Sequence, residues 1–348
     1  FSTHQSSITV LVPSYSEETA VIRKTILSAA LQEYPDLRVV LLLDDNPFKV
    51  RPEDETRLSA TRALSSEIKE LLSEPYEHFS KALVRIENPK SQSKKVTGKA
   101  VLEVAAQYMW AAEWLNDFAD KEEIEDHVDV FFANQVLREL AKDLSLVGEA
   151  LRASNEEGAT LSYERIVQLY RRLVWIFAAE ISVFERKRYV SLSHESNKAM
   201  NLNSYIGLMG GAYRQEQSPE GIILVPTTDY EAADMIVPES EFVLTLDADS
   251  VLLREYCLRL VYFLQQPDNA DVAVAQTPYS SFRGASTRLE RLSGATTDIQ
   301  HIIHQGMSHY GATFWVGANA VIRKQALEDI VEKEWVGGFE IKRYVQDR

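Results

Sequence analysis

Two aspartates stand two residues apart at the end of an apolar run, in the order Asp247-Ala248-Asp249 after residues 242–246. Carboxylate oxygens suit Mg²⁺ and Mn²⁺, and Mg²⁺ commonly takes one or two protein carboxylates while phosphate oxygens of a bound ligand fill other positions. The pattern therefore indicates a metal site that a phosphate-bearing ligand completes. An acidic pair at a strand end is also common as a turn or helix cap, so the pair alone leaves both interpretations open.

A second acidic pair, Asp44-Asp45, follows the β-branched, apolar run 38–43, and Pro13-Ser14-Tyr15 closes a similar run at 8–12. Both runs are typical of buried parallel strands. Residues 17–32 between them have helical spacing, which predicts a βαβ unit and an α/β fold. Ligands of such sheets bind beyond the carboxyl ends of the strands, and both polar segments fall there.

Helical periodicity dominates the middle of the chain, from residue 53 to about 189, where strand signals are sparse. The sheet is expected to resume at 242–246 and to continue at 272–276, and the segment 313–323 is expected to lead into a helix. The helices predicted in the middle segment are 57–72, 99–115, 130–151 and 163–184, and those predicted further on are 254–265 and 324–331.

Composition argues against one class of function. Because the chain has a formal net charge of −15, we do not expect an exposed track for nucleic-acid phosphates, although the net charge leaves a locally basic pocket open. A single cysteine, Cys257, rules out an internal disulfide framework and fits a reducing compartment, so a cytoplasmic location is expected. The chain opens on Phe1 and has no long apolar run, and we expect it to be a segment of a longer protein whose membrane helices lie outside it.

Five motifs, taken in order, resemble the family 2 glycosyltransferases. Gln276-Thr277-Pro278 and the stretch from Gly317 to Arg323 are similar, more narrowly, to the catalytic domains of cellulose, chitin and hyaluronan synthase-like enzymes, which build polysaccharides. The five motifs are Val12-Pro-Ser-Tyr-Ser-Glu-Glu18, Leu43-Asp-Asp-Asn46, Asn197-Lys-Ala-Met-Asn-Leu-Asn203, Asp247-Ala-Asp249 and Gly317-Ala-Asn-Ala-Val-Ile-Arg323.

The resemblance implies a Rossmann-like, glycosyltransferase-A-type mixed sheet flanked by helices, here with a long helical insertion. It implies one catalytic domain over 1–348, with a nucleotide-binding part at 1–52 and 190–253, the insertion at about 53–189 and an acceptor-side part at 254–348. The expected reaction is inverting transfer of a hexose from a nucleotide-diphosphate sugar, usually UDP-linked, to a glycan or lipid-linked acceptor at the cytosolic face of a membrane. Mg²⁺ or Mn²⁺ is the implied cofactor.

The same resemblance assigns roles to the nucleotide-binding residues. Asp45 would accept a hydrogen bond from the uracil ring, Asp247 would face the ribose or the metal, and Asp249 would ligate the metal directly. Lys198 would lie beside the diphosphate as a point charge. The residues expected to border the nucleoside are Pro13, Ser14, Tyr15 and Glu18.

Three further residues carry weaker assignments. The general base of this family follows a Gly-Gly-Phe turn, and here Asp347 stands about where that base would lie, with Gln346 in place of the preceding glutamate. The base therefore lies either at Asp347 or beyond the end of the segment. Asn319 and Arg323 would belong to the acceptor side or to the support of the sheet.

Two other functions remain open at this level. A nucleotidyltransferase also uses such a sheet and an acidic metal site, although no Gly-rich, basic triphosphate loop follows Val12. A non-catalytic scaffold would use the helical middle segment to bind a protein. Nucleoside triphosphates and nucleotide sugars, offered separately, discriminate between these interpretations.

Overall fold

The protein is described by a computed structural model covering residues 6–48, 51–87, 97–315 and 317–344. Its centre is a six-stranded sheet in the order β3-β2-β1-β7-β9-β8. The first four of these are mutually parallel, whereas β9 runs antiparallel to both neighbours. The strands are β1 (Ile8–Ser14), β2 (Leu37–Leu43), β3 (Glu180–Phe184), β7 (Phe242–Thr245), β8 (Val274–Gln276) and β9 (Ala320–Arg323). The predicted mixed α/β sheet flanked by helices is confirmed.

The predicted βαβ unit is the core of this sheet. Every residue of β1 is buried, and β2 is buried except at Arg38, as expected for strands covered on both faces. Helix α1 (Thr19–Ala30) connects the two strands and turns Ile22, Ile26 and Leu27 into the core. The parallel pairing aligns Ile8 with Leu37 at the start of the strands and Ser14 with Leu43 at their end.

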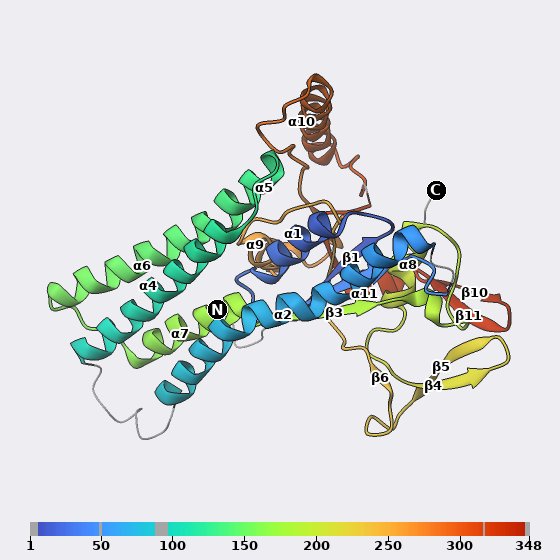
Figure 1. Cartoon of the computed structure of the whole chain (residues 1–348), viewed down its shortest axis with the longest axis horizontal. Coiled ribbons are helices and arrows are strands. Elements are labelled where there is room, and N and C mark those ends of the chain that lie inside the picture. The colour runs from blue at the N-terminus through green and yellow to red at the C-terminus, as the bar shows by residue number, and fades with distance from the viewer. Residues whose placement is uncertain (1–5, 49–50, 88–96, 316, 345–348) are drawn as a thin grey trace.

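A helical arm extends from one side of the sheet (Figure 1). It contains α2 (Pro52–Glu87), α4 (Gly98–Lys121), α5 (His127–Phe131), the π-helical segment η1 (Phe132–Arg138), α6 (Glu139–Glu156) and α7 (Tyr163–Phe177). Aromatic rings fill the space between these helices: Phe79 stacks on Phe177 with ring centroids 5.7 Å apart, and Trp114 meets Phe177 edge-on at 5.5 Å. The buried residues of the arm and of one sheet face form a single apolar cluster.

Two predicted helices differ from the structure. The helix predicted at 163–184 ends at Phe177, and residues 180–184 form strand β3 instead. Ile181 and Phe184 are buried and Ser182 is exposed, and this segment completes the hydrogen bonds of β2, a long-range contact that local periodicity does not register. The helix predicted at 130–151 is divided by η1 between α5 and α6.

Smaller elements complete the fold. A three-stranded sheet contains β4 (Ala212–Ser218), β5 (Gly221–Thr227) and β6 (Met235–Ile236), and a hairpin contains β10 (Glu332–Val336) and β11 (Phe339–Arg343). The remaining helices are η2 (Arg186–Arg188), α8 (Lys198–Ile206), α9 (Tyr256–Leu264), η3 (Pro267–Asn269), α10 (Arg288–His309) and α11 (Lys324–Asp329). Among the helices described, none has both the length and the apolar character needed to cross a bilayer.

Candidate functional site

Four strand ends meet at one edge of the sheet. Because β3, β2, β1 and β7 are parallel and adjacent, the segments that follow them lie side by side. The amide of Asp44 donates to the carbonyl of Ser14 at 2.9 Å, and the amide of Leu246 donates to the carbonyl of Leu11 at 2.9 Å. The predicted nucleotide-binding segments and the predicted metal-binding segment therefore share one edge, as the parallel pattern indicated.

Asp45 has one satisfied and one unsatisfied carboxylate oxygen. Asp45 as a whole residue is 8% exposed. Its Oδ1 accepts a hydrogen bond from Nη2 of Arg57 at 2.8 Å. Oδ2 is buried and has no hydrogen-bond partner within the described ranges. A buried charged oxygen without a donor is costly, so this atom is suited to receive a donor from a bound ligand.

The neighbouring Asp44 is held by two basic residues that sequence reasoning missed. The guanidinium of Arg186 is fully buried, and its Nε donates to Asp44 Oδ1 at 2.7 Å. Lys187 Nζ donates to the Asp44 carbonyl at 2.5 Å and lies 3.3 Å from Oδ2. Both residues lie just after the end of β3. A basic run that follows a strand could have pointed to them, but this strand was predicted as part of a helix.

The loop after β1 is shaped by Glu17, which the sequence did not single out. Its Oε2 accepts hydrogen bonds from the hydroxyl of Ser14 at 2.5 Å and from the amide of Tyr15. Ser16 adopts a φ of 62°, a left-handed conformation that costs energy in a non-glycine residue and that this bonding holds in place. Glu18, predicted to border the nucleoside, is exposed and is the N-cap residue of α1, whose side chain makes no capping hydrogen bond.

Tyr15 offers an aromatic surface beside this loop. Pro13 and Ser14 are buried, but Tyr15 is 64% exposed. The Nζ of Lys187 lies 5.9 Å from the centre of its ring, within cation–π range. An exposed aromatic ring at this edge of the sheet offers a face on which a planar heterocycle can stack.

The Asp247 carboxylate is shared between two donors. Lys198, the first residue of α8, donates to Oδ1, and the hydroxyl of Tyr279 donates to Oδ2 at 3.2 Å. Burial, reinforced by the nearby Asp247 and Asp249 carboxylates, raises the pKa of the Tyr279 phenol above its usual value, which keeps it a hydrogen-bond donor. Sequence reasoning did not identify Tyr279, although it directly follows the Gln276-Thr277-Pro278 motif.

Asp249 is the more exposed member of the acidic pair at this edge. It is exposed, and no residue that the structure describes donates a hydrogen bond to its carboxylate. The described residues contain no cluster of three or more His, Cys, Asp or Glu arranged to hold a metal. The residues present fit a divalent ion that takes one or two carboxylates here and its other ligands from phosphate and water. Both carboxylate oxygens of Asp247 already accept a hydrogen bond, from Lys198 and from Tyr279.

Asn319 supports the turn that carries both aspartates. Its φ of 51° is left-handed, a conformation that asparagine tolerates better than most residues. Its Oδ1 accepts from the Asp247 amide at 3.4 Å, and its Nδ2 donates to the Ser250 hydroxyl at 3.1 Å. Arg323 supports the sheet, because its Nε donates a hydrogen bond to the Val272 carbonyl at 2.8 Å.

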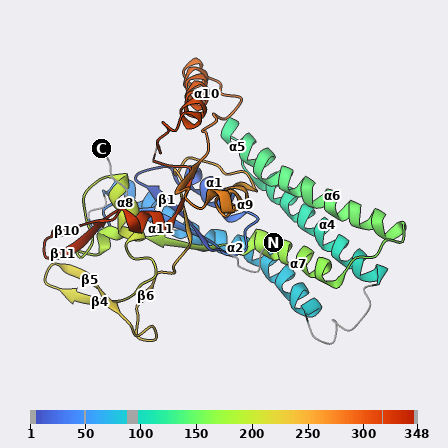
Figure 2. The same ribbon diagram turned by 180° about the vertical axis from the view of Figure 1, so that it is seen from behind.

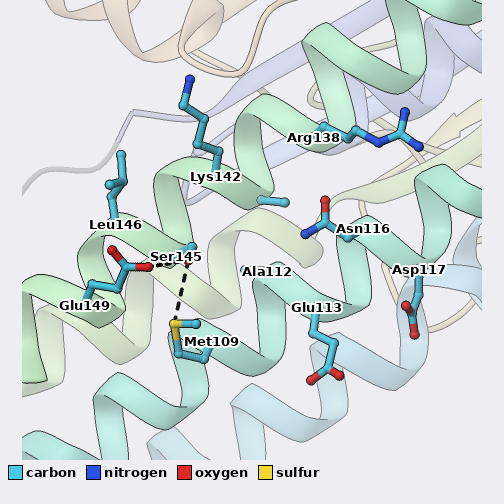
Figure 3. Close-up of a pocket in the computed structure, with 11 residues that line it drawn as sticks. Met109, Ala112, Glu113, Asn116, Asp117, Arg138, Lys142, Ser145, Leu146 and Glu149 are labelled. Atoms are coloured by element: carbon cyan, nitrogen blue, oxygen red, sulfur yellow. Dashed lines mark hydrogen bonds between the residues drawn. The ribbon is translucent and has the colours of Figure 1, made fainter.

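Two features lie apart from this edge. Asp347, the expected general base, lies outside the described residues. The pocket shown in Figure 3, of about 490 Å³, lies on the helical arm between α4 and α6 and includes Met109, Ser145 and Glu149. The Ser145 hydroxyl donates to Glu149 there, at 3.4 Å. None of the strand-end residues lines this pocket.

A comparison with known protein families finds a match over the C-terminal part of the chain, which includes the Asp247-Ala248-Asp249 segment. Residues 242–347 match a family model described as Glycosyl transferase family group 2. The matched segment begins at the first residue of β7, includes Asp247, Asp249 and Asn319, and spans less than half of the chain. The match supports a family 2 glycosyltransferase and glycosyl transfer as the general activity. No curated protein matches the chain.

Proposed function

We propose that the protein transfers a hexose, with inversion, from a UDP-linked sugar to a glycan or lipid-linked acceptor, and that the reaction depends on Mg²⁺ or Mn²⁺. The family match supports the general activity. The observation that carries the finer proposal is the buried Oδ2 of Asp45, which has no hydrogen-bond partner among the described residues and lies at the same sheet edge as Asp249. No membrane or nucleic-acid contact is part of this proposal.

The nucleoside half of the proposal depends on Asp45 and Tyr15. The N3–H of uracil is a donor, and Asp45 Oδ2 is an acceptor to which no residue that the structure describes donates a hydrogen bond. The exposed ring of Tyr15 supplies a face on which the base stacks. Arg57, Arg186 and Lys187 hold the two aspartates of this pocket, although all three lie in the segment 53–189 predicted as an insertion.

The diphosphate half depends on Asp249 and Lys198. When bound, the divalent ion stabilises the negative charge that develops on the leaving nucleoside diphosphate. Asp249 supplies a carboxylate for it, and Lys198 changes partner from Asp247 to a phosphate oxygen as the donor enters. Asp247 is then released toward the metal or the ribose. Asp347 remains the proposed base that takes the proton of the acceptor hydroxyl.

The test is calorimetry with a panel of nucleotide sugars and nucleoside triphosphates, each with and without Mn²⁺. We expect UDP-sugars to bind more tightly with Mn²⁺ and Asp249→Ala to abolish that increment alone. Asp268→Ala, at an exposed aspartate of η3, is the matched control and should retain it. Equal Mn²⁺ dependence in Asp249→Ala would refute the metal site. Preference for a triphosphate would favour a nucleotidyltransferase, and no binding at all would favour a scaffold.

A further inference from the structure

Tyr256, the first residue of α9, joins two loops that converge on Asp247. Helix α9 lies beside α1 in both views of the fold (Figures 1 and 2). The hydroxyl of Tyr256 donates to the Asn319 carbonyl at 2.7 Å and lies 2.8 Å from the hydroxyl oxygen of Thr277. A phenol has one proton to donate, so the Thr277 hydroxyl is the donor in the second of these bonds. Burial raises the pKa of the Tyr256 phenol well above its usual value, which keeps that proton in place.

The first loop carries Asn319, which holds the backbone of the acidic pair. Its side chain accepts a hydrogen bond from the Asp247 amide and donates one to the Ser250 hydroxyl. Asn319 has a left-handed φ of 51°, a conformation that needs support from its surroundings. Its carbonyl receives this support from the Tyr256 hydroxyl and from the Thr277 amide, which donates at 3.4 Å. Tyr256 therefore fixes the backbone from which the Asn319 side chain reaches Asp247.

The second loop follows β8 and carries Tyr279, which holds the side chain of Asp247. Thr277 attaches the start of this loop to Tyr256, and Tyr279 lies two residues further on. The Tyr279 hydroxyl donates to Asp247 Oδ2 at 3.2 Å. Because Pro278 restricts the backbone between them, the position of Thr277 limits where Tyr279 can reach. The amide and the carboxylate of Asp247 are thus both held by loops that Tyr256 joins.

We propose that Tyr256 is a positioning residue for Asp247, because its hydroxyl fixes both loops that orient this aspartate. The consequence for metal binding rests on the proposed function. In that function Lys198 leaves Oδ1 of Asp247 when the diphosphate binds, and the hydrogen bond from Tyr279 remains to set the direction of the carboxylate. Tyr256 acts through the two loops, so it is not itself a catalytic residue.

The turn that carries the acidic pair has a separate anchor in α1. The hydroxyl of Thr25 donates to the Ala248 carbonyl at 2.6 Å, and the hydroxyl of Ser28 accepts an amide hydrogen bond from the segment just after the turn. Neither bond involves Tyr256. Loss of the Tyr256 hydroxyl should therefore leave the turn in place and loosen its Asp247 end.

The test is Tyr256→Phe, which removes the hydroxyl and keeps the ring. Amide hydrogen exchange of the ligand-free chain should become about tenfold faster at Asp247, as expected for the loss of a supporting hydrogen bond. Calorimetry should show that Mn²⁺ tightens UDP binding about tenfold less than in the parent, while UDP without Mn²⁺ binds within about twofold of the parent. The control is Tyr108→Phe, which removes a buried hydrogen bond to the Leu169 carbonyl in the arm and should change neither quantity.

Variants at Thr277 separate the hydroxyl from the size of the side chain. Thr277→Ser keeps the hydroxyl that bonds to Tyr256 and should keep the full Mn²⁺ effect. Thr277→Val has the same shape but no hydroxyl, so it should lose part of that effect. Tyr256→Phe/Thr277→Val should lose no more than Tyr256→Phe alone, because both changes break the same bond.

Two results would overturn the proposal. One is an Asp247 amide that exchanges at the same rate in Tyr256→Phe and in the parent. The other is a lowered melting temperature in Tyr256→Phe with an unchanged Mn²⁺ effect, which would show that Tyr256 supports the fold alone. Failure of the proposed function is a different result, since UDP binding by the parent would then not respond to Mn²⁺. Amide exchange would in that case still decide whether Tyr256 positions Asp247.

Discussion

Replacing Asp45 with asparagine tests the nucleoside pocket with a change of one functional group. The substitution keeps the size of the side chain but turns one carboxylate oxygen into an NH₂ donor. The new amide would direct its carbonyl to Arg57 and therefore point its NH₂ to the place that Oδ2 now occupies. The N3–H of uracil would then meet a donor instead of an acceptor.

The size of the effect follows from the burial of Asp45, whose side chain is 10% exposed. A hydrogen bond to a charged group in such a setting contributes about 1.5–3 kcal/mol, so the Kd for UDP should rise about 10- to 150-fold. The cytosine ring presents an acceptor at N3, so the preference for UDP over CDP should shrink or reverse. Stability should fall by only about 1 kcal/mol, because Arg57 keeps Asp54 at 3.8 Å.

Calorimetry with UDP and CDP on the parent and on Asp45→Asn measures both quantities. Asp54→Asn is the matched control, since Asp54 pairs with the same arginine but has no role in the proposed pocket. We expect this control to bind UDP like the parent. An unchanged UDP affinity and UDP:CDP ratio in Asp45→Asn would show that Oδ2 does not contact the base, and the uridine assignment would have to be abandoned.

Three other measurements address the diphosphate site and the supports of the fold. Lys198→Gln should weaken UDP binding in Mn²⁺ by about tenfold yet leave free uridine unaffected, because Lys198 is proposed to contact phosphate only; equal losses for both ligands in calorimetry would contradict this role. Arg186→Met should lower the free energy of unfolding in urea by about 3–5 kcal/mol, since it leaves the Asp44 carboxylate buried without its main partner, whereas Arg188→Met, at a half-exposed guanidinium, should cost less than about 1 kcal/mol. The free energy of unfolding should also decline between about pH 10 and 12. Burial raises the pKa of Tyr108, Tyr170 and Tyr205 to about 12, whereas tyrosines of the unfolded state have a pKa of about 10, so the folded state binds these protons more tightly. Urea titrations at pH 9 and pH 11 that gave the same free energy of unfolding would contradict this expectation.

The sequence by itself was enough to predict the βαβ unit and the place of its polar strand ends. Strands β1 and β2 are covered on both faces, so their residues read as continuous apolar runs, and α1 carries one apolar side. Once these two strands are parallel, their carboxyl ends must share an edge, which brought Ser14 and Asp45 to the same side without any knowledge of their contacts. Asp249 joins them because β7 also pairs parallel with β1, which the tertiary structure decided.

Only the tertiary structure decided which partner each charged residue takes. Asp44 meets Arg186 across 142 positions of the chain, and Asp247 meets Lys198 across 49. Such pairs depend on the order of strands in the sheet, which no local pattern encodes. The same holds for residues 180–184, which form β3 because they pair with the backbone of β2.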